Sequence, residues 1–147
     1  MKLLLLPFSL ICYIPVAGQQ ITGTWEGKMY DPYSKGDTVL VEVEIRGKTN
    51  KNLSGNSMCR FKTGYYAQAA IAGKYDSVKK ELYLQERFIE STNMPEFSAL
   101  FLDEYYLNFD QEGKLSGIVR CKGLAHNDSR IRMPCHDNMY MDLIRKQ

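Results

Sequence analysis

Few residues of this chain could do chemistry, and Glu86 is the most informative of them. Glu86 alternates with Leu82, Leu84 and Phe88, so an extended chain places its carboxyl group on the apolar face. Inside a domain this carboxyl would have a raised pKa or a partner, and it could orient a ligand or act as a general acid or base. If the face turns outward near the strand end, Glu86 is solvated instead. The sequence leaves both alternatives open.

Cysteine and histidine residues are the other candidates for site chemistry. His126 and His136 lie near Cys121 and Cys135, but their spacing fits no standard zinc finger or ribbon. His136 directly follows Cys135, so in a strand the two side chains would point to opposite faces. The chain also has no Ser-His-Asp order, Gly-rich phosphate loop or metalloprotease helix. We therefore expect no metal site, no cofactor and no enzyme.

The elements that must position these residues are strands. Segment 38–46 alternates strictly, with β-branched residues on one face and charged residues on the other, which indicates a strand with one buried face. Only 95–102 has a composition that suits a helical turn. Seven further segments have an extended pattern: 22–30, 53–61, 65–75, 80–89, 104–110, 114–121 and 138–145.

The connections between these segments are mostly short and rich in Gly, Asn and Asp, which favours hairpins. Parallel strands would need a connection of about a dozen residues, usually a helix, and no such helical stretch is present. Eight antiparallel strands either stack as a sandwich or close into a barrel, and closure removes exposed edges. We predict an all-β fold, an eight-stranded antiparallel up-and-down β-barrel.

The composition is that of one ordinary globular domain. The 147 residues include 44% hydrophobic and 24% charged positions, and 19 basic against 17 acidic residues leave a formal charge of +2. This near balance excludes the strong basic field that would indicate nucleic acid or an anionic membrane as a partner.

The start of the chain resembles an export signal. Lys2 precedes an apolar run, and the small or short residues at 16–18 suit a signal-peptidase site. We predict a signal peptide at 1–18, a single barrel domain at 19–147, and a secreted or periplasmic protein. The alternative is a lipoprotein anchored through Cys12, which follows a loose lipobox-like sequence. No other apolar stretch is long enough to be a transmembrane segment.

Export would place the remaining cysteines in an oxidising environment, where one disulfide is expected. Cys59 and Cys121 end two similar Leu-Ser-Gly segments, which begin at Leu53 and Leu115. This repeat places the two cysteines on the third and seventh strands, on opposite walls of a barrel and too far apart to bridge. Cys121 and Cys135 flank one loop, so we predict a disulfide between them and a buried thiol at Cys59.

The predicted domain opens on the motif Gly23-Thr24-Trp25-Glu26-Gly27. A Gly-x-Trp motif followed by an eight-strand meander resembles the calycin group of lipocalins, avidin-like barrels and fatty-acid-binding-like proteins. It is most similar to the small secreted lipocalin-like barrels of bacteria. Gly23 would let the chain enter the barrel base tightly, and Trp25 would plug that base. The resemblance implies that Arg145 stacks over Trp25. Typical lipocalins carry a helix before the last strand, and no such helix is recognisable here.

The resemblance implies a barrel that encloses a small apolar or amphipathic ligand without catalysis. A single Trp argues against avidin-type biotin binding. The alternative is a closed-core structural or interaction module, which would bind a protein or glycan through surface tyrosines and the long connections 90–101 and 122–137. An enzyme that uses Glu86 or Cys59 is the third hypothesis. We predict that the barrel lining includes Tyr65, Leu82, Leu84, Glu86, Phe88, Tyr105 and Leu107.

Overall fold

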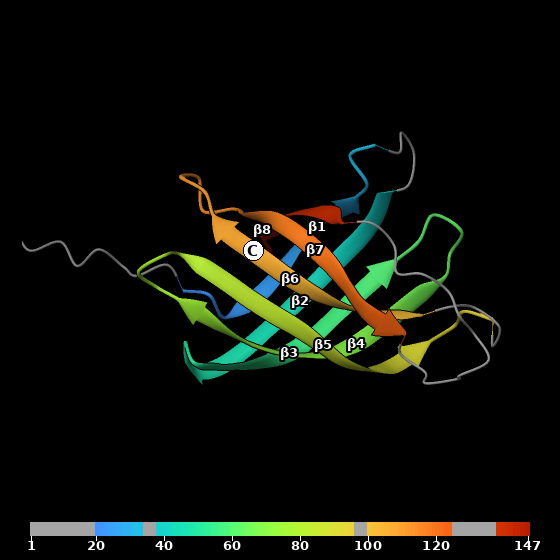
Figure 1. The fold of residues 1–147 in the computed structure, drawn as a ribbon, viewed down its shortest axis with the longest axis horizontal. Helices are drawn as coiled ribbons and strands as arrows, with labels where there is room; N and C mark the ends of the chain where they lie inside the picture. The colour runs from blue at the N-terminus through green and yellow to red at the C-terminus, as the bar shows by residue number, and fades with distance from the viewer. Residues whose placement is uncertain (1–19, 34–37, 96–99, 125–137) are drawn as a thin grey trace, which may run out of the picture.

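The protein folds as one closed β-barrel (Figure 1). The structure is a computed structural model that describes residues 20–33, 38–95, 100–124 and 138–147, and no helix occurs in these residues. The strands are β1 (Gly23–Tyr30), β2 (Thr38–Thr49), β3 (Asn52–Arg60), β4 (Tyr66–Asp76), β5 (Glu81–Thr92), β6 (Phe101–Phe109), β7 (Leu115–Leu124) and β8 (Met139–Arg145).

The strand order around the barrel follows the chain. Each strand pairs antiparallel with the next, and β8 closes the barrel by pairing with β1, where Trp25 lies opposite Arg145. The predicted up-and-down barrel is therefore confirmed, and the sandwich alternative is excluded. This architecture is compatible with a lipocalin-like fold.

One expected element differs from the observed fold. The helical turn expected at 95–102 is wrong at its end, because Phe101 and Leu102 already belong to β6. They pair with Leu124 and Gly123 of β7, so cross-strand hydrogen bonds decide their conformation. Residues 96–99 lie outside the described residues.

A buried tryptophan fills the end of the barrel where β1 begins. Trp25 is 2% exposed, and its indole Nε1 donates a hydrogen bond to the carbonyl oxygen of Ile21 at 3.0 Å. The guanidinium of Arg145 lies 5.7 Å from the Trp25 ring centroid, and it donates hydrogen bonds to the backbone carbonyls of Gln20 and Thr22. Trp25 and Arg145 therefore close this end together, and we call it the barrel base.

Both glycines of the opening motif are needed for close approach at the barrel base. Gly23 has a φ of +132°, and a Cβ there would lie 2.8 Å from a guanidinium nitrogen of Arg145. A Cβ on Gly27 would lie 1.8 Å from the carbonyl oxygen of Asp142 on β8, which is a severe clash with backbone. The motif thus permits the tight contact of β1 with β8 that closes the barrel.

Several predictions fall on residues that the structure does not describe. They are the signal peptide at 1–18, the Cys12 anchor, and much of the long connections. Within the described ranges, no helix has the length and apolar character needed to cross a membrane.

Candidate functional site

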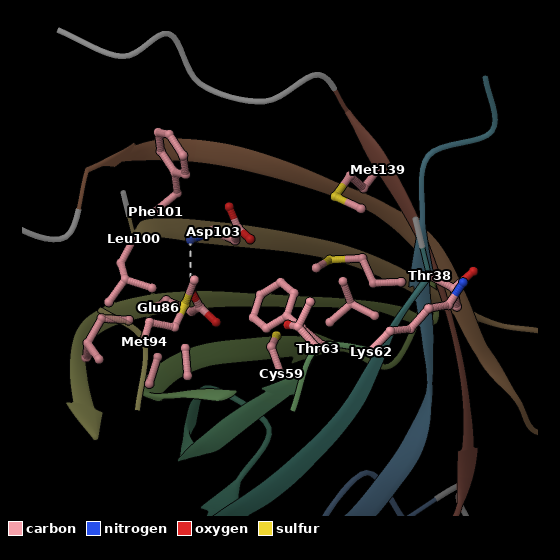
Figure 2. A pocket seen from close by; sticks show the side chains of 16 residues that line it. Thr38, Cys59, Lys62, Thr63, Glu86, Met94, Leu100, Phe101, Asp103 and Met139 are labelled. Carbon is pink, nitrogen blue, oxygen red and sulfur yellow. Dashed lines mark hydrogen bonds between the residues drawn. The ribbon is translucent and has the colours of Figure 1, made fainter. Parts of the chain in front are cut away.

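A cavity of about 450 Å³ lies at the end of the barrel opposite the base, where β3 ends and β4 begins (Figure 2). We call this end the barrel mouth. The wall of the cavity is mostly apolar, and its polar groups are few. The apolar wall includes Met29, Val39, Phe61, Ile89, Met94, Leu100, Phe101 and Met139, and the charged side chains are Glu86, Asp103 and Lys62.

Small side chains on two paired strands make room for the cavity. Ser57 of β3 lies opposite Ala69 of β4, and Cys59 lies opposite Ala67. All four positions continue the inward face that begins at the buried Leu53. Towards the base, the same face of β4 carries Ile71 and Tyr75, which are buried in the core. The cavity therefore follows from the local sequences of β3 and β4.

Glu86 is the polar centre of this interior. Its side chain is 4% exposed and accepts three hydrogen bonds. Oε1 accepts one from Ser57 Oγ at 2.6 Å and one from the hydroxyl of Tyr105. Oε2 accepts one from the backbone N–H of Asp103 at 3.0 Å, drawn as the dashed line in Figure 2. Three converging donors match an ionised carboxylate, which only accepts hydrogen bonds.

The electrostatics of the site follow from this burial. Burial raises the pKa of Glu86, and the negative charge of Asp103 raises it further, while the hydrogen bonds from Ser57 and Tyr105 lower it. Burial also raises the pKa of the Cys59 thiol, with added contributions from Glu86 and Asp103. Cys59 therefore stays a protonated thiol at neutral pH and is a poor nucleophile.

The structure places the side chain of Glu86 in the barrel interior, and the alternative of a solvated Glu86 is wrong. The inward face of β5 runs regularly from Leu82 to Glu86, and then the pairing with β4 shifts so that Arg87 is an extra residue. The prediction that Phe88 lines the interior is wrong, because this bulge turns Phe88 outward to 57% exposure. Ile89 takes the inward position and lines the cavity.

The other predicted lining residues lie in two places. Leu82, Leu84, Tyr105 and Leu107 point inward and are at most 1% exposed, in the packed core between the cavity and the base. Tyr65 is 39% exposed and precedes β4, in a turn where its carbonyl accepts a hydrogen bond from the backbone of Phe61. The prediction that Tyr65 lines the interior is therefore wrong.

Sequence reasoning missed two partners of Glu86. Ser57 is 1% exposed, and Asp103 is 7% exposed. A signal existed for both, because alternation from Leu53 puts Ser57 on the buried face, and alternation from Tyr105 does the same for Asp103. Their polar character conceals this signal, since a buried polar residue is expected only where it has a partner.

The two described cysteines lie on the strands predicted for them, although Cys59 is only partly buried. Cys59 is a free, half-buried cysteine at the cavity wall on β3, and Cys121 lies on β7 across the barrel. Cys135, His126 and His136 lie outside the described residues, so the Cys121–Cys135 disulfide stays a prediction. Within the described ranges, no group of three or more His, Cys, Asp or Glu side chains is placed to hold a metal ion.

The tyrosines divide between the interior and the outer surface. Tyr105 and Tyr75 are buried in the core. Tyr83 and Tyr106 lie on the outer face, where both hydroxyls donate hydrogen bonds to Glu104, at 3.0 and 2.9 Å. These outer rings are thus held by local polar contacts on the barrel wall.

Comparison with known proteins gives no further assignment. The chain matches no protein-family model, and no curated protein matches its sequence.

Proposed function

We propose that this barrel binds a small apolar or amphipathic molecule in the mouth cavity without catalysing a reaction. The cavity carries this proposal. Its volume of about 450 Å³ lies within the range of roughly 300–1,000 Å³ that ligand pockets occupy. An apolar wall with a few convergent polar groups is also typical of such pockets. In this proposal the chain is a lipocalin-like barrel that is exported by way of residues 1–18.

The chemistry of the cavity favours binding over catalysis. The raised pKa of Cys59 keeps the thiol protonated, and hydrogen bonds from three groups hold Glu86 in a fixed orientation. A closed-core interaction module is less well supported, because its interior would have larger side chains opposite Ala67 and Ala69.

The binding test uses N-phenyl-1-naphthylamine, a neutral dye whose fluorescence rises in an apolar site. We expect the wild-type protein to bind it saturably. Ala69→Phe adds a ring at a position that is 2% exposed and lines the cavity, so it should weaken binding at least tenfold. Ala72→Phe is the matched control, because the same ring is added on the outer side of the same strand.

Thermal unfolding of both variants shows whether each remains folded under the assay conditions. Absence of saturable dye binding to the wild-type protein would contradict the proposal. Equal binding by folded Ala69→Phe and Ala72→Phe would place the dye outside the cavity and would contradict it as well. Native mass spectrometry of the purified protein gives a second readout, because a co-purifying small molecule would appear as an added mass.

A further inference from the structure

We propose that Glu86 makes the mouth cavity selective for amphipathic amines, whose protonated head group binds against its carboxylate while the apolar body lies along the cavity wall. This inference rests on the proposed function and adds the class of ligand. It assigns Glu86 the role of a specificity-determining residue.

The first step is the position of Glu86 within the cavity. Glu86 and Asp103 lie on the neighbouring strands β5 and β6 and both line the cavity. The bond from the Asp103 backbone to Glu86 Oε2 joins the two residues, and Figure 2 shows them together at one side of the cavity. Lys62 lies at the other side of this view, beyond Cys59. The acidic side chains thus define one polar corner in a mostly apolar cavity.

The second step is the hydrogen-bonding capacity left at this corner. Oε1 of Glu86 receives two donors, whereas Oε2 receives one, from the Asp103 backbone. Each carboxylate oxygen can accept about two hydrogen bonds, so Oε2 can accept one more. Ser57 and Tyr105 already direct their hydroxyls at Glu86. A ligand that approaches this corner therefore meets an acceptor, and it binds best if it brings a donor.

The third step is charge. Ionised Glu86 is costly to bury, and the negative charge of Asp103 adds to this cost, so both raise the pKa of Glu86. A cationic head group offsets the charge of Glu86 and forms a charge-assisted hydrogen bond, which is roughly twice as strong as a neutral one. A carboxylate head group would add a further negative charge at the same place. The corner thus favours an amine over an alcohol, and an alcohol over an acid.

The fourth step is the remainder of the ligand. Phe61, Ile89, Met94, Leu100 and Phe101 supply apolar surface from separate parts of the wall. Methionine side chains adapt to irregular shapes, so Met94 fits a wall that accommodates more than one apolar body. A strongly hydrated diamine or amino acid would leave this surface without a partner. The ligand class is therefore an amine with one extended apolar portion.

The experiment compares three probes of equal chain length: decylamine, 1-decanol and decanoic acid. Each displaces N-phenyl-1-naphthylamine from the folded full-length barrel at neutral pH, below its aggregation concentration. We expect decylamine to bind at least tenfold more tightly than decanoic acid, with decanol between them. This ranking uses the wild-type protein, so it does not depend on the folding of a variant.

Two substitutions that each remove one carboxylate then test whether the preference for amines depends on Glu86. Glu86→Gln should weaken decylamine binding about tenfold and leave decanoic acid binding unchanged or tighter. Glu90→Gln, on the exposed outer side of the same strand, should leave all three affinities unchanged. Decanoic acid binding as tightly as decylamine, or an equal effect of both substitutions, would overturn the amine inference and leave the proposed function standing. Failure of dye and probes alike to bind would overturn both.

Discussion

Adjacent tyrosines on β6 provide a matched test of how burial changes the contribution of one hydrogen bond. The hydroxyl of Tyr105 donates a hydrogen bond to the carboxylate of Glu86. The hydroxyl of Tyr106 donates one to the carboxylate of Glu104. Tyr105 is 0% exposed, whereas Tyr106 is 39% exposed. Substitution by phenylalanine removes one hydroxyl from each and keeps the ring. The two variants therefore differ in burial and in little else.

The expected magnitudes differ because water can replace only the outer hydroxyl. Without Tyr105, Oε1 of Glu86 keeps only the bond from Ser57, and the buried carboxylate loses a charge-assisted donor. Such bonds contribute about 1.5–3 kcal/mol, so Tyr105→Phe should lower the free energy of unfolding by about 2 kcal/mol at a pH where Glu86 is ionised. Tyr106→Phe should lower it by less than about 1 kcal/mol.

The pH dependence supplies a second criterion. The hydrogen bond from Tyr105 lowers the pKa of Glu86, so it stabilises the ionised form. As the pH falls through the raised pKa of folded Glu86, the carboxyl becomes neutral, and the cost of Tyr105→Phe should shrink towards about 1 kcal/mol. The cost of Tyr106→Phe should stay constant until the pH falls below the ordinary carboxyl range, because hydrogen bonds lower the pKa of Glu104.

Urea unfolding at several pH values gives the free energy of unfolding and its pH dependence, with the fluorescence of Trp25, the only tryptophan, as the signal. Equal destabilisation by the two substitutions would refute the argument that burial determines the value of the bond. A cost of Tyr105→Phe that does not shrink as the pH falls through the pKa of folded Glu86 would refute the assignment of the bond to ionised Glu86.

Three further predictions concern the barrel base and the carboxyl group of Glu86. Gly27→Ala should lower the free energy of unfolding by about 3 kcal/mol or more, measured by urea, because its Cβ would lie 1.8 Å from the carbonyl oxygen of Asp142. Arg145→Ala should lower the unfolding midpoint through loss of the contact with Trp25, and Arg145→Lys should recover only part of it, since lysine lacks the planar fork. Burial raises the pKa of Glu86 in the folded state, so its contribution to stability is greatest below the unfolded pKa and is lost as the pH rises through the folded pKa. Stability relative to Glu86→Gln should therefore fall as the pH rises from the ordinary carboxyl range through the raised pKa of folded Glu86, and a constant difference would contradict this.

Alternation predicted most of the fold because a strand has a period of two. Once Val39, Val41, Val43 and Ile45 share one face, that face must be buried, and short turns then leave only antiparallel neighbours. Closure of the barrel follows less directly. It requires β1 to approach β8 at Gly27, and the sequence shows only that a glycine is there.

The environment of Glu86 was only partly predictable. Alternation along the strand predicted which face Glu86 occupies. Its hydrogen-bond donors lie on other strands, 29 residues earlier at Ser57 and 19 residues later at Tyr105. Their meeting depends on the register of β3, β4, β5 and β6, which side-chain patterns within one strand do not specify. The bulge at Arg87 has no glycine or proline to signal it, because it is a property of the pairing between β4 and β5.

This bulge connects the register of the barrel with its capacity to hold a ligand. If β5 alternated without interruption, Phe88 would point inward beside Glu86, opposite the part of β4 where Ala69 leaves space. The extra residue Arg87 instead turns Phe88 outward and brings the slimmer, aliphatic Ile89 to the cavity wall. An aromatic ring next to Glu86 would cover the carboxylate and occupy the volume that small residues provide. The bulge therefore keeps the cavity open at the position where its polar group is available.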